Sequence, residues 1–160
     1  MLRIDMFERL LALFEKPGPK EPQRADVSAL QRAAAVLLVI AARLDGDIAP
    51  VERDGIIRLL RTRLGVSNAQ ALFVEADEEA AASTDFYQVT RIIKDRLEPQ
   101  QRATIIEMLW EVAYADGEVH DYEANLVRRV AGLLHVEDRD AGEARRRVLE
   151  RSMGKPAASA

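Results

Sequence analysis

Cysteine is absent from the 160 residues, and its absence excludes disulfide bonds and thiolate metal sites. The chain also lacks a membrane-spanning run, which needs about 18 or more consecutive apolar residues. Its most apolar stretch, residues 33–42, is closed by Arg43 and Asp45. Basic residues are not in excess, because the formal net charge is −4, so we expect no nucleic-acid partner.

The residue groups that carry catalysis are missing as well. The serines stand in helix caps and tails without a nearby histidine, and the glycines are isolated instead of forming a phosphate-binding loop. We therefore predict a protein that is not an enzyme, with no catalytic residues and no small-molecule substrate. Asp5 and Glu8 interrupt the segment that a signal peptide would need to be apolar, so we expect a cytoplasmic location.

What is present is helical periodicity, and no segment has the alternation of a strand. The sequence predicts an all-α fold. Residues 1–15 form a short amphipathic helix, prolines among charges predict a linker over 16–26, and the domain spans 27–152 before a flexible tail over 153–160. Seven helices are expected in the domain, over about 27–44, 50–63, 67–82, 84–97, 99–115, 121–134 and 138–152.

Local signals set several helix boundaries. Ser67 followed by Gln70 has the spacing of a capping box, so we expect Ser67 to cap the third helix. Pro50 suits the first position of the second helix. Gly46 and Gly117 each follow a predicted helix, where a left-handed residue is needed that glycine supplies at no steric cost.

A duplicated segment is the most specific feature of the chain. Residues 41–52 read AARLDGDIAPVE and residues 112–123 read VAYADGEVHDYE, at a constant offset of 71 residues. Each copy joins an apolar helix to an amphipathic one, and residues 64–67 resemble 134–137 after a one-residue slip. The simplest packing is a bundle with the apolar helices 27–44 and 99–115 side by side, related by a pseudo-two-fold axis.

Both copies carry acids at matching positions. These are Asp45, Asp47 and Glu52 in the first copy, and Asp116, Glu118 and Glu123 in the second. In a structural reading, Ile48 and Val119 anchor the turns in the core and the last acids stabilise the N-terminus of the next helix. That reading gives no strong reason for two acids in each turn. In a functional reading the carboxylates bind Ca²⁺ or Mg²⁺, in a motif shorter than an EF-hand.

Other candidate groups have simpler explanations. Glu107 and Glu111 lie four apart on one helix face, but no Glu-x-x-His pairing accompanies them, so a di-iron site is not expected. We expect these two carboxylates to be solvated, or to pair with Arg102 or an arginine of the last helix. His120 stands where the first copy has Ala49, which argues against an essential role.

The segments LLVIAARLDGDIAPVERDGIIRLL and IIEMLWEVAYADGEVHDYEANLVRRVAGLLHV resemble the tellurite-resistance protein B-like (TerB-like) family, over about residues 27–150. The resemblance implies a seven-helix bundle with pseudo-two-fold symmetry. It also implies a link to tellurite and general stress resistance, often beside membrane-associated partners, and metal binding by the six acids. Pro50 stands where the second copy has Asp121, so equal binding at the two turns is in doubt.

Two functional hypotheses follow. In the first, the chain is a non-enzymatic TerB-like module of a stress-response system that binds a divalent cation weakly through the acidic turns. In the second, it is a protein-interaction adaptor with purely structural turns, whose N-terminal helix or acidic surface meets a protein partner. An enzyme that uses a metal at the same turns is the least favoured reading, because no nucleophile accompanies the acids.

Overall fold

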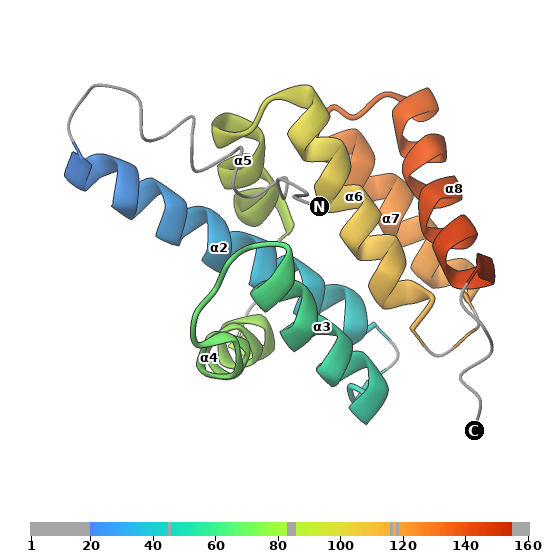
Figure 1. The fold of residues 1–160 in the computed structure, drawn as a ribbon, viewed down its shortest axis with the longest axis horizontal. Helices are drawn as coiled ribbons and strands as arrows, with labels where there is room; N and C mark the ends of the chain where they lie inside the picture. The colour runs from blue at the N-terminus through green and yellow to red at the C-terminus, as the bar shows by residue number, and fades with distance from the viewer. Residues whose placement is uncertain (1–19, 45, 83–85, 116, 118, 155–160) are drawn as a thin grey trace.

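The computed structural model describes residues 20–44, 46–82, 86–115, 117 and 119–154. In this part of the chain there are seven helices and no strand, which confirms the predicted all-α fold (Figure 1). The helices are α2 (Lys20–Ala42), α3 (Pro50–Thr62), α4 (Ala69–Ala82), α5 (Phe86–Arg96), α6 (Pro99–Ala113), α7 (Asp121–Leu133) and α8 (Asp138–Gly154). The predicted helix over 1–15 lies outside the described residues.

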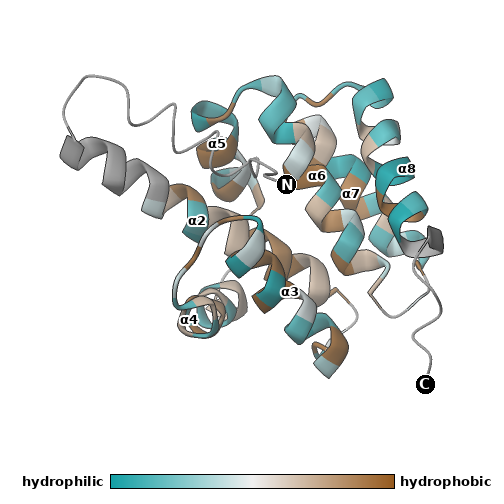
Figure 2. Ribbon diagram, viewed as in Figure 1, coloured by the Kyte–Doolittle hydropathy of each residue, from teal (hydrophilic) through white to brown (hydrophobic). Residues whose placement is uncertain are grey.

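α2 and α6 pack against each other at the centre of the molecule, as the sequence predicts. Every residue from Ala33 to Ala42 is buried, because α3, α4, α5 and α6 all pack against α2. A helix covered on all sides has to be apolar all round, which the AAAVLLVIAA segment is. The outer helices carry both hydrophilic and hydrophobic residues (Figure 2). No helix in the described ranges is both long enough and apolar enough to cross a membrane.

The start of α2 differs from the prediction. The sequence predicts a linker over 16–26, whereas α2 begins at Lys20, so residues 20–26 are helical. Pro22 falls in the first helical turn, where a backbone N–H has no acceptor within the helix. Its missing N–H therefore does not disturb the helix. At the other end, α8 continues to Gly154, two residues into the predicted tail.

The cap of α4 also differs from the prediction. The sequence predicts Ser67 as the capping residue, but α4 begins at Ala69 and its cap is Asn68. The Asn68 Oδ1 accepts a hydrogen bond from the N–H of Ala71 at 3.1 Å. A capping side chain must stand directly before the first helical residue to reach that N–H, and only Asn68 does.

The two halves of the chain, α2 to α5 and α6 to α8, contain equivalent long-range contacts at nearly the same offset as the sequence repeat. Gln31 on α2 donates a hydrogen bond to the carbonyl of Leu64 at 2.9 Å, and Arg102 on α6 donates one to the carbonyl of Leu134 at 2.7 Å. The next residue has a positive φ in both halves, +66° at Gly65 and +56° at residue 135. The local repeat therefore extends beyond the acidic turns, while the pseudo-two-fold axis stays a prediction.

Ion pairs attach α4 to α2 and α8 to α6, with opposite polarity in the two halves. The partners are arginines on α2 or directly after it, and acids on α4: Arg32 pairs with Glu75 and Glu79, and Arg43 with Asp77, at 2.7–3.1 Å. On α6 the partners are acids, and on α8 they are the arginines Arg147 and Arg151. Figure 1 shows α4 at the lower left and α8 at the right, so the acidic outer helix and the arginine-bearing outer helix lie on different sides of the molecule.

The ion pairs of the second half form one cluster, which also includes Arg63 at the end of α3. Glu107 is 6% exposed, and its two oxygens lie 2.7 Å from Arg151, 3.1 Å from Arg147 and 3.4 Å from Arg63. Glu111 lies 2.9 Å from Arg151 and 3.3 Å from Arg63. The predicted pairing with the last helix is confirmed, and the partner from α3 is an addition. The cluster therefore links α3, α6 and α8.

The charge of Glu107 is maintained although the side chain is buried. Burial raises the pKa of this carboxyl, but hydrogen bonds from Arg151 and Arg147 and the positive charge of Arg63 outweigh burial. The net effect places the pKa of Glu107 below its ordinary value of 4.5. Because the folded pKa is depressed, the stabilisation is present above the unfolded pKa and is lost as the pH falls through the folded pKa.

We predict that Glu107→Ala lowers the free energy of unfolding by about 3 kcal/mol at pH 7, because it leaves three arginines around an empty site. Urea unfolding, followed by the fluorescence of the single tryptophan, Trp110, measures the loss. The difference between wild type and Glu107→Gln should shrink as the pH falls below 4.5. Glu150→Gln, in an exposed pair with Arg146, serves as the control and should cost under about 0.5 kcal/mol. A Glu107→Gln difference that does not change with pH would contradict this account.

Candidate functional site

The two acidic turns have similar backbone features at their glycines. The φ of Gly46 is +117° and that of Gly117 is +87°, so both positions need the freedom of glycine that the sequence predicts. Each glycine lies within the turn, and its N–H donates to the carbonyl three residues earlier, at 3.0 Å and 2.9 Å. A Cβ at either position would meet nothing within 4 Å, so conformation and not space selects glycine.

Apolar side chains anchor each turn, and a glutamate caps the helix that follows. Ile48 and Val119 pack against the core as the structural reading predicts. Glu52 and Glu123 are 7% and 8% exposed. Oε1 of Glu52 accepts the N–H of residue 49 at 3.0 Å, and Oε1 of Glu123 accepts the N–H of residue 120 at 2.9 Å. This contact is the return half of a capping box, in which the third helical residue reaches back to the capping residue.

The sequence places Glu52 and Glu123 correctly in the first helical turn but does not reveal this contact. The usual signal is Ser or Thr at the capping position, and these turns have Ala49 and His120 there. Of the capping-box pattern, these turns keep only the acid three residues after the capping position. At the start of α6, Gln101 makes the same contact, accepting the N–H of residue 98 at 2.8 Å. The contact therefore needs an oxygen acceptor and does not need a negative charge.

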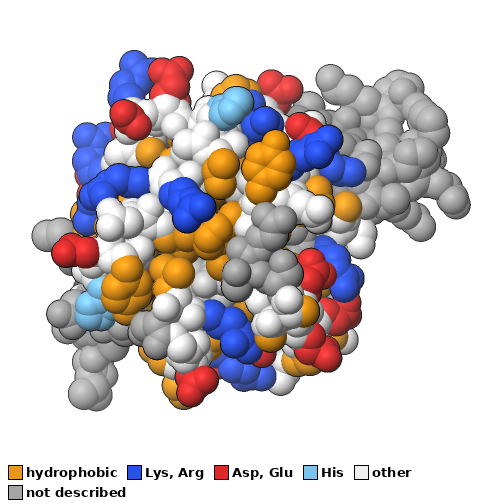
Figure 3. Space-filling model, turned by 180° about the vertical axis from the view of Figure 1, so that it is seen from behind, with side chains coloured by type: hydrophobic (Ala, Val, Ile, Leu, Met, Phe, Trp, Pro, Cys, Tyr) orange, Lys and Arg blue, Asp and Glu red, His pale blue; other side chains and the backbone are white. Residues whose placement is uncertain are grey.

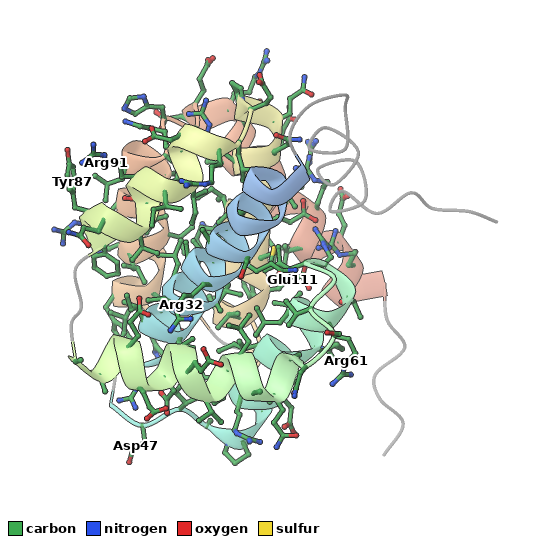
Figure 4. The ribbon with its side chains drawn as sticks, turned by 90° about the vertical axis from the view of Figure 1, so that its left-hand side faces the viewer. Arg32, Asp47, Arg61, Tyr87, Arg91 and Glu111 are labelled. Atoms are coloured by element: carbon green, nitrogen blue, oxygen red, sulfur yellow. The ribbon has the colours of Figure 1, made fainter. Side chains whose placement is uncertain are left out.

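Of the other four predicted ligands, the structure describes only Asp47. Asp47 is exposed and points away from the bundle (Figure 4). Asp45, Asp116 and Glu118 lie outside the described residues. Among the residues that are described, no three His, Asp or Glu side chains gather closely enough to hold a metal ion. The site of six acids therefore stays a prediction.

One pocket, of about 500 Å³, lies between the residues that flank the two turns. Val51 in the first turn of α3 lines it on one side, and Ala115, which directly precedes the second Asp-Gly pair, lines it on the other. Its remaining walls come from α3, α6 and α8, and are Asp54, Gly55, Arg58, Leu59, Glu111, Val112, Tyr114, Val148 and Arg151. Figure 1 shows both turns at the same end of the molecule.

We predict that Glu52→Gln and Glu123→Gln each cost under about 0.5 kcal/mol of folding free energy, because the amide oxygen replaces the acceptor. Glu52→Ala and Glu123→Ala should each cost about 1–2 kcal/mol, because a backbone N–H loses its partner. Urea unfolding distinguishes the two classes. An equal loss in the Gln and Ala variants would mean that charge, and not the acceptor, matters at these positions.

Comparison with known proteins bears on the identity of the chain. The family model of the tellurite resistance protein TerB matches residues 31–146, from α2 into α8. No curated protein and no solved structure matches the chain. The matched segment includes both acidic turns and the helices on either side of them, and it covers more than half of the 160 residues. The chain belongs to the TerB family.

Proposed function

We propose that this protein is a non-enzymatic module of a tellurite-resistance-type stress system, and that it binds a divalent cation weakly at its two acidic turns. Membership of the TerB family supports the tellurite-resistance type of module. The observation that carries the cation proposal is the position of the turns, because Ala115, directly before Asp116, and Val51, four residues after Asp47, line one pocket. We propose that carboxylates from both turns, one set from each half of the chain, bind one ion.

The capping contacts narrow the set of ligands. Glu52 and Glu123 each have one carboxylate oxygen on a backbone N–H at the start of a helix, so we assign them to positioning the turns. The proposed ligands are the acids of the turns themselves, which are Asp45, Asp47, Asp116 and Glu118. Ca²⁺ and Mg²⁺ both prefer carboxylate oxygens and retain water where protein ligands are few. With at most four carboxylates, the ion keeps part of its water shell and binds weakly.

The test is thermal unfolding with Ca²⁺ or Mg²⁺ against a chelator. Wild type should be stabilised, by about 2.7 kcal/mol when the free ion is at 100 times its dissociation constant. The double variant Asp45→Asn/Asp116→Asn should lose this stabilisation. The matched control is Glu78→Gln/Glu137→Gln, which removes two negative charges from exposed positions away from the pocket and should keep it.

A failure of this test would favour the second function. If no ion shifts the unfolding temperature, or if both double variants lose the shift equally, the acidic turns are structural. The capping roles of Glu52 and Glu123 already illustrate how carboxylates can serve the fold at these turns. The protein would then be an interaction adaptor, and partner binding should be compared between the full chain and a chain starting at residue 20, where α2 begins.

A further inference from the structure

α5 occupies a place in the first half that no described helix occupies in the second. It packs on α2 and α7, and a groove between α4 and α5 runs over Ala29, Ala33 and Val36 of α2. At the offset of 71 residues, the corresponding positions on α6 are polar, namely Gln100, Thr104 and Glu107. The arginines of the buried cluster cover Glu107 in place of a helix. The second half therefore has polar or charged residues at positions where the first half has apolar ones.

The pocket between α3, α6 and α8 corresponds to the place where α5 begins. Phe86, the first residue of α5, lies under Arg129 of α7, with the guanidinium carbon 5.7 Å from the ring centroid. The residue of α3 that corresponds to Arg129 is Arg58, and it lines the pocket. Within the described ranges Arg58 is exposed and has no ion pair. An aromatic side chain on a bound helix could therefore pack under Arg58 in the same way as Phe86 packs under Arg129.

Charge indicates what kind of helix the pocket suits. α5 carries three basic residues, Arg91, Lys94 and Arg96, against the single acid Asp95, and it lies across a groove from the acidic α4. In the second half the neighbouring helix is α8, which carries arginines. The basic α5 lies beside the acidic α4, whereas α8 is basic. A helix that lies beside α8 in the corresponding place therefore has to be acidic to complement its charge.

The pocket has the features of a helix-binding groove. Its floor includes the buried apolar residues Leu59, Val112 and Val148. Arg151 stands in its wall, fixed by Glu107 and Glu111 in an orientation that costs little further entropy on binding. The pocket lining and the cluster together contain four arginines, at positions 58, 63, 147 and 151, and three acids, at positions 54, 107 and 111, which leaves a net charge of +1. On the face seen from behind, acidic and basic side chains are interspersed, without such a separation by sign (Figure 3).

We propose that the groove between α3, α6 and α8 binds an acidic amphipathic helix of a partner protein, seated on α6 and α3 as α5 is seated on α2 and α7. The charge of the groove selects this occupant over the chain's own residues 1–15, in which two arginines nearly balance three acids. The binding does not require a cation at the turns, so its test is made in the presence of a chelator.

The test uses a fluorescein-labelled peptide with the sequence of residues 86–97 carrying Arg91→Glu, Lys94→Glu and Arg96→Glu. Fluorescence anisotropy should show saturable binding to the full chain, with a dissociation constant of about 10–100 μM that weakens with added salt. The unaltered 86–97 peptide is the matched control and should bind at least about tenfold more weakly, because its basic residues face arginines.

Variants of the protein locate the site. Arg58→Glu/Arg61→Glu should weaken binding of the acidic peptide by about tenfold or more. Arg61 points outward one turn beyond Arg58, on the side of the molecule away from Tyr87 and Arg91 (Figure 4). Arg91→Glu/Arg128→Glu makes the same change of charge on α5 and α7 and should leave binding within about twofold. Trp110 fluorescence and circular dichroism confirm that each variant is folded.

Four results would overturn the proposal. The first is an absence of saturable binding, and the second is equal binding of the acidic and unaltered peptides. The third is binding that appears only when residues 1–19 are removed, because the chain's own N-terminal segment would then be the occupant. An effect of Arg58→Glu/Arg61→Glu no larger than that of the control variant would equally exclude this groove as the site.

Discussion

The burial of α2 is the constraint on which the rest of the structure depends. From Ala33 to Ala42 the helix has no exposed face, so helices must surround it on every side. Burial of apolar surface contributes about 25 cal/mol per Å², so this segment is a large part of the stabilising free energy. α6 supplies one side of the cover and has its own outer helices, α7 and α8. The arrangement of the helices in space follows from the need to cover the apolar surfaces of α2 and α6 at the same time.

The turns that lead out of the central helices combine three local requirements. A glycine with positive φ reverses the chain, an aliphatic residue returns to the core, and a glutamate caps the next helix. Each requirement accounts for one position of the repeated motif. The acids within the turns are not accounted for in this way, and they are the residues on which the proposed cation binding rests.

The two halves repeat the arrangement of the backbone but not the charges of the side chains that join the helices. The same pair of helices is attached by arginines on α2 or directly after it and acids on α4 in one half, and by acids on α6 and arginines on α8 in the other. Position 36 is a buried valine beside α4 and α5, whereas position 107 is a glutamate held by three arginines. In one half α5 packs beside α4 on the central helix, and in the other half the corresponding place is a pocket with arginines in its wall.

The sequence by itself determined the all-α fold, most helix boundaries, the glycines of the turns and the repeat. These follow from periodicity, proline, glycine and spacing, which act within a few residues. The tertiary structure alone decided the contacts between distant residues. Arg63 meets Glu107 across 44 positions, and Val51 and Ala115 meet at one pocket, because α3 packs against α6. By contrast, the contacts of Glu52 and Glu123 with the N–H groups of residues 49 and 120 span only three residues, so they are local even though Ala49 and His120 are not usual capping residues.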